Sequence, residues 1–191
     1  MIKGIILMVE KDNFFVLTGG PGSGKTSVVN ALARRGLHCI PEAGREIIQE
    51  QTLIGGRAVP WIDPRNFREL MLSRDLQAYR SNMERSEVVI FDRGIVDALG
   101  YSRLTGLEDD EHLYQAIKRY RYNRRVFIAP PWEEIYLNDS ERKQTFREAI
   151  ATYDAMTLTY KSAGYSLIEL PLVSVERRAR LILDIVSTDA G

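Results

Sequence analysis

The fold is decided by the stretch Gly19-Gly20-Pro21-Gly22-Ser23-Gly24-Lys25-Thr26. It matches the pattern GxxxxGK[ST] without a mismatch, and it stands between an apolar run at 14–18 and a helical pattern at 25–35. Glycines let backbone N–H groups turn inward around a phosphate, and a helix that begins near Lys25 directs its positive dipole end at the same anion. The stretch therefore predicts a phosphate-binding loop (P-loop). The alternative is a glycine-rich turn that only caps a helix.

The residue types in this loop also predict how a nucleotide is held. Lys25 is long enough to reach the β- and γ-phosphates, and the hydroxyl of Thr26 can ligate Mg²⁺. The Asn-Lys-x-Asp guanine motif usual in GTPases does not occur in the sequence, so ATP is the favoured nucleotide. The residues expected to bind it are Gly19, Gly20, Pro21, Gly22, Ser23, Gly24, Lys25, Thr26 and Ser27.

Outside the loop, short apolar runs alternate with amphipathic helical patterns. Such runs are typical of buried parallel strands, and the alternation predicts an α/β fold, a parallel five-stranded sheet with helices on both faces. In such sheets ligands bind beyond the carboxyl ends of the strands. Strands are expected at 14–18, 37–40, 88–91, 126–129 and 165–170, and helices at 25–35, 42–53, 64–83, 95–104, 111–122, 140–163 and from 174 onward.

Length and composition exclude several classes of protein. The 191 residues include 26 Lys and Arg and 26 Asp and Glu, so the net charge of zero argues against a dedicated nucleic-acid or polybasic membrane protein. One cysteine cannot form an intrachain disulfide or a cysteine zinc cluster. The apolar run at 5–9 is too short to span a membrane. We expect a cytoplasmic protein with an N-terminal extension at 1–13 and a single domain at 14–191.

A carboxylate and a basic residue follow the third predicted strand. Asp92 can hold Mg²⁺ through water or act as a base toward a substrate hydroxyl, and its structural alternative is to cap the next helix. Motor-type ATPases usually carry a glutamate directly after this aspartate to activate water. Arg93 stands there instead, which favours binding of a substrate anion over hydrolysis.

The P-loop, the stretch FDRGIVDALGY at 91–101 and the stretch NDSER at 138–142 resemble P-loop kinases such as thymidylate and deoxynucleoside kinases. The chain is most similar, over 14–186, to the small AAA-like domain family that includes the ribosylnicotinamide-kinase part of NadR. The resemblance implies the strand order 2-3-1-4-5, the use of ATP and Mg²⁺, and a helical lid around 133–148. It leaves the acceptor open.

The resemblance also points to Glu42 and Arg142. In nucleoside kinases a glutamate after the second strand lies close to the acceptor hydroxyl, so Glu42 competes with Asp92 for the role of base, or it is only a first-turn glutamate favoured by the helix dipole. Arg142 would belong to the lid and stabilise the negative charge of the transferred group, or it would lie in a solvated first turn. Trp61 either stacks on a base or sugar of the acceptor or only packs against the rest of the protein.

Together these patterns predict an ATP- and Mg²⁺-dependent phosphotransferase acting on a small nucleoside, nucleotide or cofactor-precursor acceptor. The alternative is an ATP-dependent switch or binding module with slow ATPase activity. A basic cluster at 118–125 with tyrosines between its cations offers RNA binding, which the zero net charge disfavours. The predicted catalytic residues are Lys25, Asp92, Arg93, Arg142 and Glu42, and the predicted metal-binding residues are Thr26 and Asp92.

Overall fold

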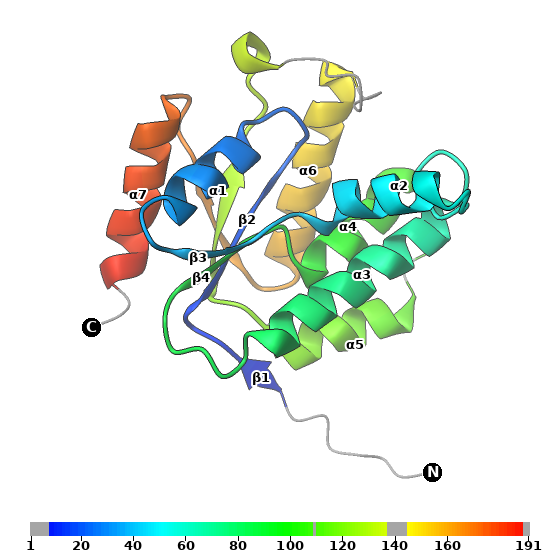
Figure 1. The fold of residues 1–191 in the computed structure, drawn as a ribbon, viewed down its shortest axis with the longest axis horizontal. Helices are drawn as coiled ribbons and strands as arrows, with labels where there is room; N and C mark the ends of the chain where they lie inside the picture. The colour runs from blue at the N-terminus through cyan, green and yellow to red at the C-terminus, as the bar shows by residue number, and fades with distance from the viewer. Residues whose placement is uncertain (1–7, 109, 137–144, 189–191) are drawn as a thin grey trace.

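The computed structural model describes residues 8–108, 110–136 and 145–188, in which a parallel five-stranded sheet lies between two layers of helices (Figure 1). β2 occupies the centre of the sheet, with β4 on one side and β6 on the other. The elements are β1 (Val9–Glu10), β2 (Phe14–Gly19), α1 (Lys25–Ala33), β3 (His38–Ile40), α2 (Ala43–Leu53), α3 (Pro64–Ser81), β4 (Val89–Asp92), α4 (Ile95–Thr105), α5 (Glu111–Arg119), β5 (Tyr120–Arg121), β6 (Arg125–Ala129), the 3-10 turn η1 (Glu133–Ile135), α6 (Phe146–Ser162), β7 (Ser166–Glu169) and α7 (Val175–Thr188).

The predicted α/β fold is confirmed. The strands of the sheet lie in the order β3-β4-β2-β6-β7, and every pairing is parallel. These labels differ from the expected 2-3-1-4-5 because β1 and β5, which the sequence patterns did not reveal, form a separate parallel pair. Counted along the chain within the large sheet alone, its strands are the second, third, first, fourth and fifth.

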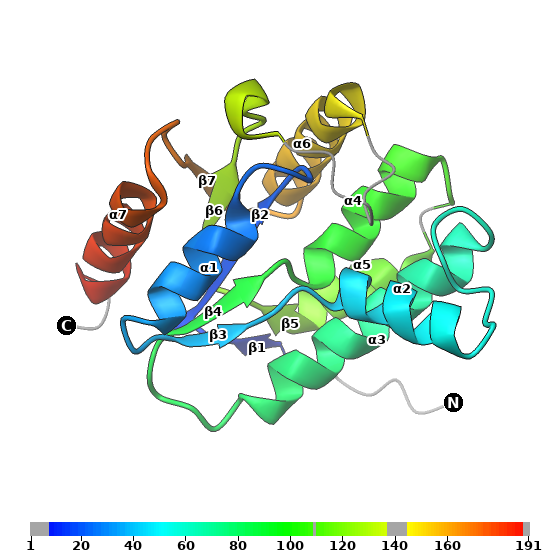
Figure 2. The ribbon, with the colours of Figure 1, turned by 45° about the horizontal axis from the view of Figure 1, so that its top comes forward.

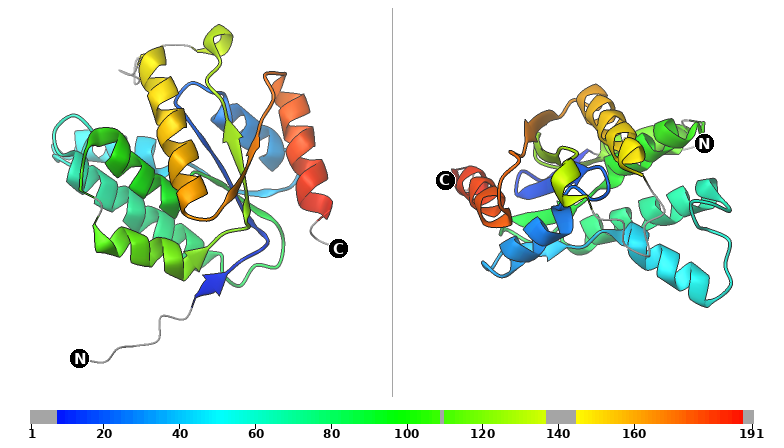
Figure 3. Two further views of the ribbon diagram at one scale, coloured as in Figure 1. Left: turned by 180° about the vertical axis from the view of Figure 1, so that it is seen from behind. Right: turned by 90° about the horizontal axis from the view of Figure 1, so that it is seen from above.

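Side chains of the central strand alternate between two apolar cores. Phe14 and Val16 belong to the core under α3, α4, α5 and α6, whereas Phe15 and Leu17 belong to the core under α1 and α7. All four side chains are fully buried. A strand covered on both faces carries apolar residues that point to either side, which is why 14–17 is an unbroken apolar run. Figure 2 and the two views of Figure 3 show the two helical layers on opposite sides of the sheet.

The predicted helix at 111–122 is wrong at its carboxyl end. α5 ends at Arg119, and Tyr120 takes up an extended conformation as the first residue of β5. The rings of Tyr120 and Tyr122 pack edge-on against Tyr79, with ring centres 5.3 and 5.1 Å apart. Burial of these aromatic rings together with the pairing of β5 and β1 outweighs the helical pattern of the sequence.

The helix predicted over 140–163 begins only at Phe146. Thr145 is its N-cap, because the Thr145 hydroxyl accepts a hydrogen bond from the backbone N–H of Glu148 at 3.3 Å. The Glu148 carboxylate accepts a hydrogen bond in return from the backbone N–H of Thr145, which completes a capping box. Arg142 and most of the predicted lid lie outside the described residues.

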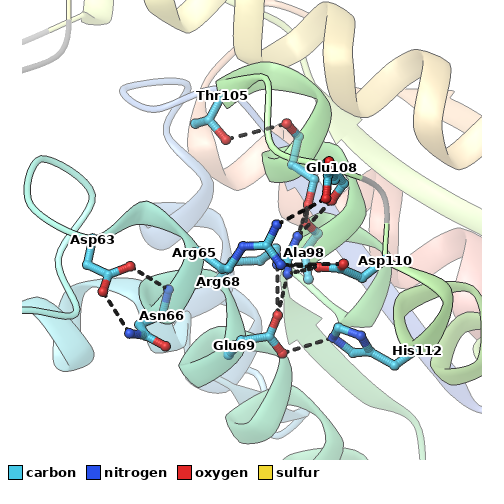
Figure 4. Close-up of polar contacts among 11 residues, drawn as sticks. Asp63, Arg65, Asn66, Arg68, Glu69, Ala98, Thr105, Glu108, Asp110 and His112 are labelled. Atoms are coloured by element: carbon cyan, nitrogen blue, oxygen red, sulfur yellow. Dashed lines mark hydrogen bonds and ion pairs between the residues drawn. The ribbon is translucent and has the colours of Figure 1, made fainter.

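A fully buried arginine joins α3, α4 and α5 (Figure 4). Arg68 donates hydrogen bonds to the Ser102 hydroxyl in the last turn of α4 and to a backbone carbonyl in the turn after α4. It also donates to the carboxylates of Glu69 and Asp110. His112 adds a contact to Glu69 at 2.9 Å. Glu69, Asp110 and His112 thus have metal-ligand chemistry, but a guanidinium already neutralises both carboxylates. We interpret the cluster as a structural ion-pair network.

Among the described residues, no helix combines the length and the apolar character needed to cross a membrane.

Candidate active site

The P-loop connects the end of β2 to the start of α1 and requires glycine for two reasons. Gly19, Gly22 and Gly24 have φ angles of 132°, 70° and 81°, which L-amino acids with side chains rarely adopt. A Cβ atom on Gly19 would lie 2.4 Å from the carbonyl oxygen of Ala129, and one on Gly20 would lie 2.3 Å from that of Ala149 in α6. The loop is therefore wedged between β6 and α6, and its path depends on the absence of side chains.

The ammonium group of Lys25 lies over this loop. Its Nζ donates a hydrogen bond to the carbonyl oxygen of Gly20 at 2.7 Å, and the same oxygen accepts one from the Ser23 hydroxyl at 2.8 Å. Lys25 is only 5% exposed, and burial, with a contribution from the charge of Arg93, lowers the pKa of Lys25 to about 8. A phosphate oxygen would be a stronger, charged acceptor for this ammonium than a carbonyl is.

Asp92 is the last residue of β4 and lies opposite Leu17 of β2, two residues before Gly19. Its side chain is buried, and among the described residues its Oδ1 has no hydrogen-bond partner. Burial, together with the charge of Glu42, raises the pKa of Asp92 to about 6. A buried carboxylate oxygen without a partner is unfavourable by itself, and it suits a hard cation or the water bound to one.

Arg93 and Glu42 form an ion pair at the edge of the same cluster. The Arg93 Nε donates to Glu42 Oε1 at 2.9 Å, and its Nη1 donates to Asp97 Oδ1 at 3.0 Å. Burial opposes the charge of Arg93, but Glu42 and Asp97 raise its pKa above the usual value. Among the described residues, Arg93 alone has a positive φ angle without being glycine, at 71°. Glu42 precedes α2, and its side chain is 34% exposed.

The structure thus brings four of the five predicted catalytic residues together at the carboxyl ends of β2, β3 and β4. Lys25, Asp92, Arg93 and Glu42 are close enough to influence one another's pKa. Thr26 and Ser27 are exposed in the first turn of α1. Arg142 lies outside the described residues. Trp61, in the loop between α2 and α3, is 52% exposed.

Two carboxylates near this cluster were not singled out from the sequence. Asp97 contacts Arg93 directly. Asp75 of α3 is partly buried, and its burial, with the charge of Asp97, raises its pKa well above the usual value. One signal could have revealed Asp75: it lies three residues after Leu72 and four before Tyr79, on the buried face of the helix.

Two further segments contact the P-loop: the turn that follows β6, and α7 (Figure 2). A Cβ atom on Gly22 would lie 2.5 Å from the ring of Tyr136. Arg178 of α7 donates to the Ser23 carbonyl oxygen at 2.8 Å, and its guanidinium lies 4.9 Å from the ring centre of Trp132. Among the described residues, the buried Nη2 of Arg178 has no hydrogen-bond partner. The hydrophobic periodicity of the sequence gave no sign of the contact between Arg178 and Ser23, because these residues lie far apart in the chain.

Comparison with known proteins identifies the family. A sequence family described as an AAA domain matches residues 14–178. The chain belongs to this family. The AAA domain is also 33% identical over 96 residues to the tRNA modification GTPase MnmE of Maricaulis maris, which covers 49% of this chain and 22% of that protein. The chain therefore spans less than a quarter of the length of this curated relative.

The AAA domain has the fold of P-loop kinases. It superimposes on the NadR protein in complex with NR with a TM-score of 0.71 at 15% identity, over 91% of this chain and 51% of that one. It superimposes on deoxyadenosine kinase from M. mycoides with a TM-score of 0.65 at 12% identity, over 92% of this chain and 99% of that one. At such low identities the similarity shows the fold alone.

Proposed function

We propose that this AAA domain is a P-loop phosphotransferase that transfers a phosphoryl group from ATP to a small nucleoside, nucleotide or cofactor-precursor acceptor. The observation that supports transfer over simple hydrolysis is the ion pair of Arg93 and Glu42 beside the P-loop. In the proposal, Arg93 would contact anionic oxygens and the partly exposed carboxylate of Glu42 would contact a hydroxyl, both close to Lys25. Hydrolysis of ATP does not require the Arg93–Glu42 pair, because water is then the acceptor.

In this proposal the backbone N–H groups of residues 19–27 surround the phosphates, and Lys25 exchanges the Gly20 carbonyl for an oxygen of the transferred group. Phosphoryl transfer depends mainly on positioning and on neutralisation of charge, both of which a buried ammonium supplies. Because phosphate is anionic, its binding raises the pKa of Lys25 from about 8 and keeps the side chain protonated.

The residues present also fit Mg²⁺, because the Oδ1 of buried Asp92 has no hydrogen-bond partner in the part of the chain that the structure describes. Thr26 would hold the ion through its hydroxyl, and Asp92 would hold it through a bound water. When bound, Mg²⁺ would neutralise charge on the β- and γ-phosphates.

The acceptor side is assigned to Glu42 and Arg93. Asp92 is buried and committed to the metal, whereas Glu42 is partly exposed at the edge of the cluster. Glu42 therefore orients the acceptor hydroxyl and takes its proton as the oxygen attacks the γ-phosphorus atom. The lid at 133–148, with Arg142 as its cation, remains part of the proposal. Arg147 is exposed in the first turn of α6.

A screen for ADP release tests this function. Purified protein is incubated with Mg²⁺, ATP or GTP, and a panel of nucleosides, nucleotides and cofactor precursors. We expect at least one acceptor to raise nucleoside-diphosphate release above the rate without acceptor. If nucleotide binds but no acceptor raises that rate, the switch or binding module replaces the kinase.

The substitution Lys25→Ala should lower turnover by about 100-fold or more, because it removes the cation that faces the transferred group. The matched control is Lys161→Ala, which removes an exposed lysine of α6, and its turnover should equal that of the wild type. Turnover by Lys25→Ala at the wild-type rate would contradict the assigned site.

A further inference from the structure

Asp97, in the first turn of α4, accepts four hydrogen bonds while its side chain is buried. Its Oδ1 accepts from the hydroxyl of Thr18 at 2.7 Å and from Nη1 of Arg93 at 3.0 Å. Its Oδ2 accepts from the hydroxyl of Tyr160 at 2.6 Å and from the backbone N–H of Gly94 at 3.0 Å. Each carboxylate oxygen thus has two donors, which is more than helix capping requires.

The donors come from segments that each contribute to the candidate site. Thr18 directly precedes Gly19, the first residue of the P-loop. Arg93 lies at the carboxyl end of β4, and Tyr160 lies in α6, the helix against which Gly20 packs through Ala149. The left view of Figure 3 shows α6 running alongside the sheet. Asp97 therefore joins the strand before the P-loop, the residue after Asp92 and the helix behind the loop.

Asp97 also limits the direction of the Arg93 side chain. Asp97 and Glu42 bind Nη1 and Nε of the guanidinium, so two carboxylates fix its plane. No hydrogen bond from Nη2 reaches any residue in the described part of the chain. Nη2, the guanidinium nitrogen of Arg93 for which the described residues offer no partner, is therefore held in a fixed direction and is available to an anionic oxygen.

We propose that Asp97 is a positioning residue for phosphoryl transfer, because it holds Arg93 in the direction needed to contact anionic oxygens. Through its hydrogen bonds to Thr18 and Tyr160 it also fixes the position of Arg93 relative to the P-loop. This inference rests on the proposed function, and it adds a residue that touches neither nucleotide nor acceptor. Because Asp97 acts through Arg93, its removal should lower turnover and leave nucleotide affinity unchanged.

The test is a double-mutant cycle of Asp97→Asn and Arg93→Ala. Asparagine keeps the shape of the side chain, but it retains only one oxygen and cannot accept from all four donors. We expect Asp97→Asn to lower kcat by roughly tenfold to a hundredfold, with the Kd of a non-hydrolysable ATP analogue within about twofold of the wild type. In the Arg93→Ala background, Asp97→Asn should change kcat by less than about twofold, because the two residues act as one unit.

A second variant keeps the test valid if Asp97→Asn folds poorly. Tyr160→Phe removes one donor to Asp97 and should lower kcat by about twofold to tenfold, the equivalent of one hydrogen bond. Tyr153→Phe is the matched control, because Tyr153 lies on the same helix but bonds Glu169 instead. Its kcat should equal that of the wild type.

Three results would overturn the inference: an unchanged kcat in Asp97→Asn, an equal loss with and without Arg93, or equal losses in the two tyrosine variants. If the wild-type protein shows no turnover with any acceptor, the proposed function is refuted instead. In that case proton exchange at the Arg93 Nε–H, followed by NMR, still decides. We expect exchange to be slow in the wild type and in Tyr153→Phe and at least about tenfold faster in Asp97→Asn; equal rates would overturn the inference.

Discussion

Lys25 and Asp92 are both buried, and burial moves the pKa of each toward neutrality. The pKa of Lys25 falls to about 8, and that of Asp92 rises to about 6. Each shift means that the ligand-free site is unfavourable for the charged form of the residue. A nucleotide phosphate would stabilise the lysine and a divalent cation would stabilise the aspartate. At the scale of single residues, the site is therefore poised for an anion and a cation together.

The pKa of Asp92 predicts a pH-dependent stability. The pKa of Asp92 is about 6 in the folded protein and 3.8 in its usual, unperturbed state. The folded protein therefore binds the proton more tightly than the unfolded chain does, and the free energy of unfolding falls as the pH rises from about 4 to about 6. Asp92→Asn removes this loss. In EDTA, the variant should match the wild type near pH 3.5 and be more stable by up to about 3 kcal/mol at pH 7. Urea unfolding at several pH values measures this difference, and a variant less stable than the wild type at pH 7 would contradict it.

At the scale of elements, α3, the carboxyl end of α4 and the start of α5 are joined by a buried cation. Arg68 of α3 reaches the turn after α4 and the residue before α5, and its side chain is fully buried. Arg65, one turn earlier on the same helix, pairs with the same Asp110 carboxylate but is 48% exposed. The two arginines therefore have similar partners and different burial.

This difference predicts unequal costs of substitution. Arg68→Met leaves two carboxylates without their buried partner and should lower the free energy of unfolding by roughly 2–4 kcal/mol. Arg65→Met should cost less than about 1 kcal/mol, because water already screens that pair. Denaturant unfolding measures both values. Nucleotide affinity should be unchanged in each variant, and equal losses of stability would show that burial does not decide the contribution of Arg68.

At the scale of the whole molecule, the P-loop is the point where both halves of the fold meet. Its backbone contacts β6 and α6 through Gly19 and Gly20, the turn after β6 through Gly22, and α7 through Ser23. A ligand bound at the loop therefore contacts a segment held by both helical layers. Its binding energy is added to the stability of the folded protein.

Thermal unfolding tests this property. ATP with Mg²⁺ at about 100 times its Kd should stabilise the protein by about 2.7 kcal/mol and raise the Tm by about 5–10 °C. The Lys25→Ala variant should show no shift at the same concentrations, and Lys161→Ala should show the full shift. Equal Tm shifts in both variants would mean that the nucleotide binds elsewhere. GTP in a parallel experiment reports which base the site prefers.

The sequence by itself determined the P-loop, the α/β class and the cluster of Lys25, Glu42, Asp92 and Arg93. The P-loop, the fold class and the places of Lys25, Asp92 and Arg93 follow from local patterns, because apolar runs mark the buried strands and the carboxyl ends of parallel strands meet at one edge. Glu42 was added by its place after the second strand together with the resemblance to nucleoside kinases. The roles of these residues, the domain limits and the lid with Arg142 stay predictions.

Only the tertiary structure decided the contacts between distant segments. Asp97 and Thr18 are separated by 79 positions and Asp97 and Tyr160 by 63, so no periodicity links them. β5 has two residues, too few for a strand pattern, and it exists because β1 pairs with it and tyrosine rings pack beside it. The contact between Arg178 and Ser23 likewise depends on where α7 docks. Local sequence sets which elements form, whereas burial of their shared surfaces sets which side chains meet.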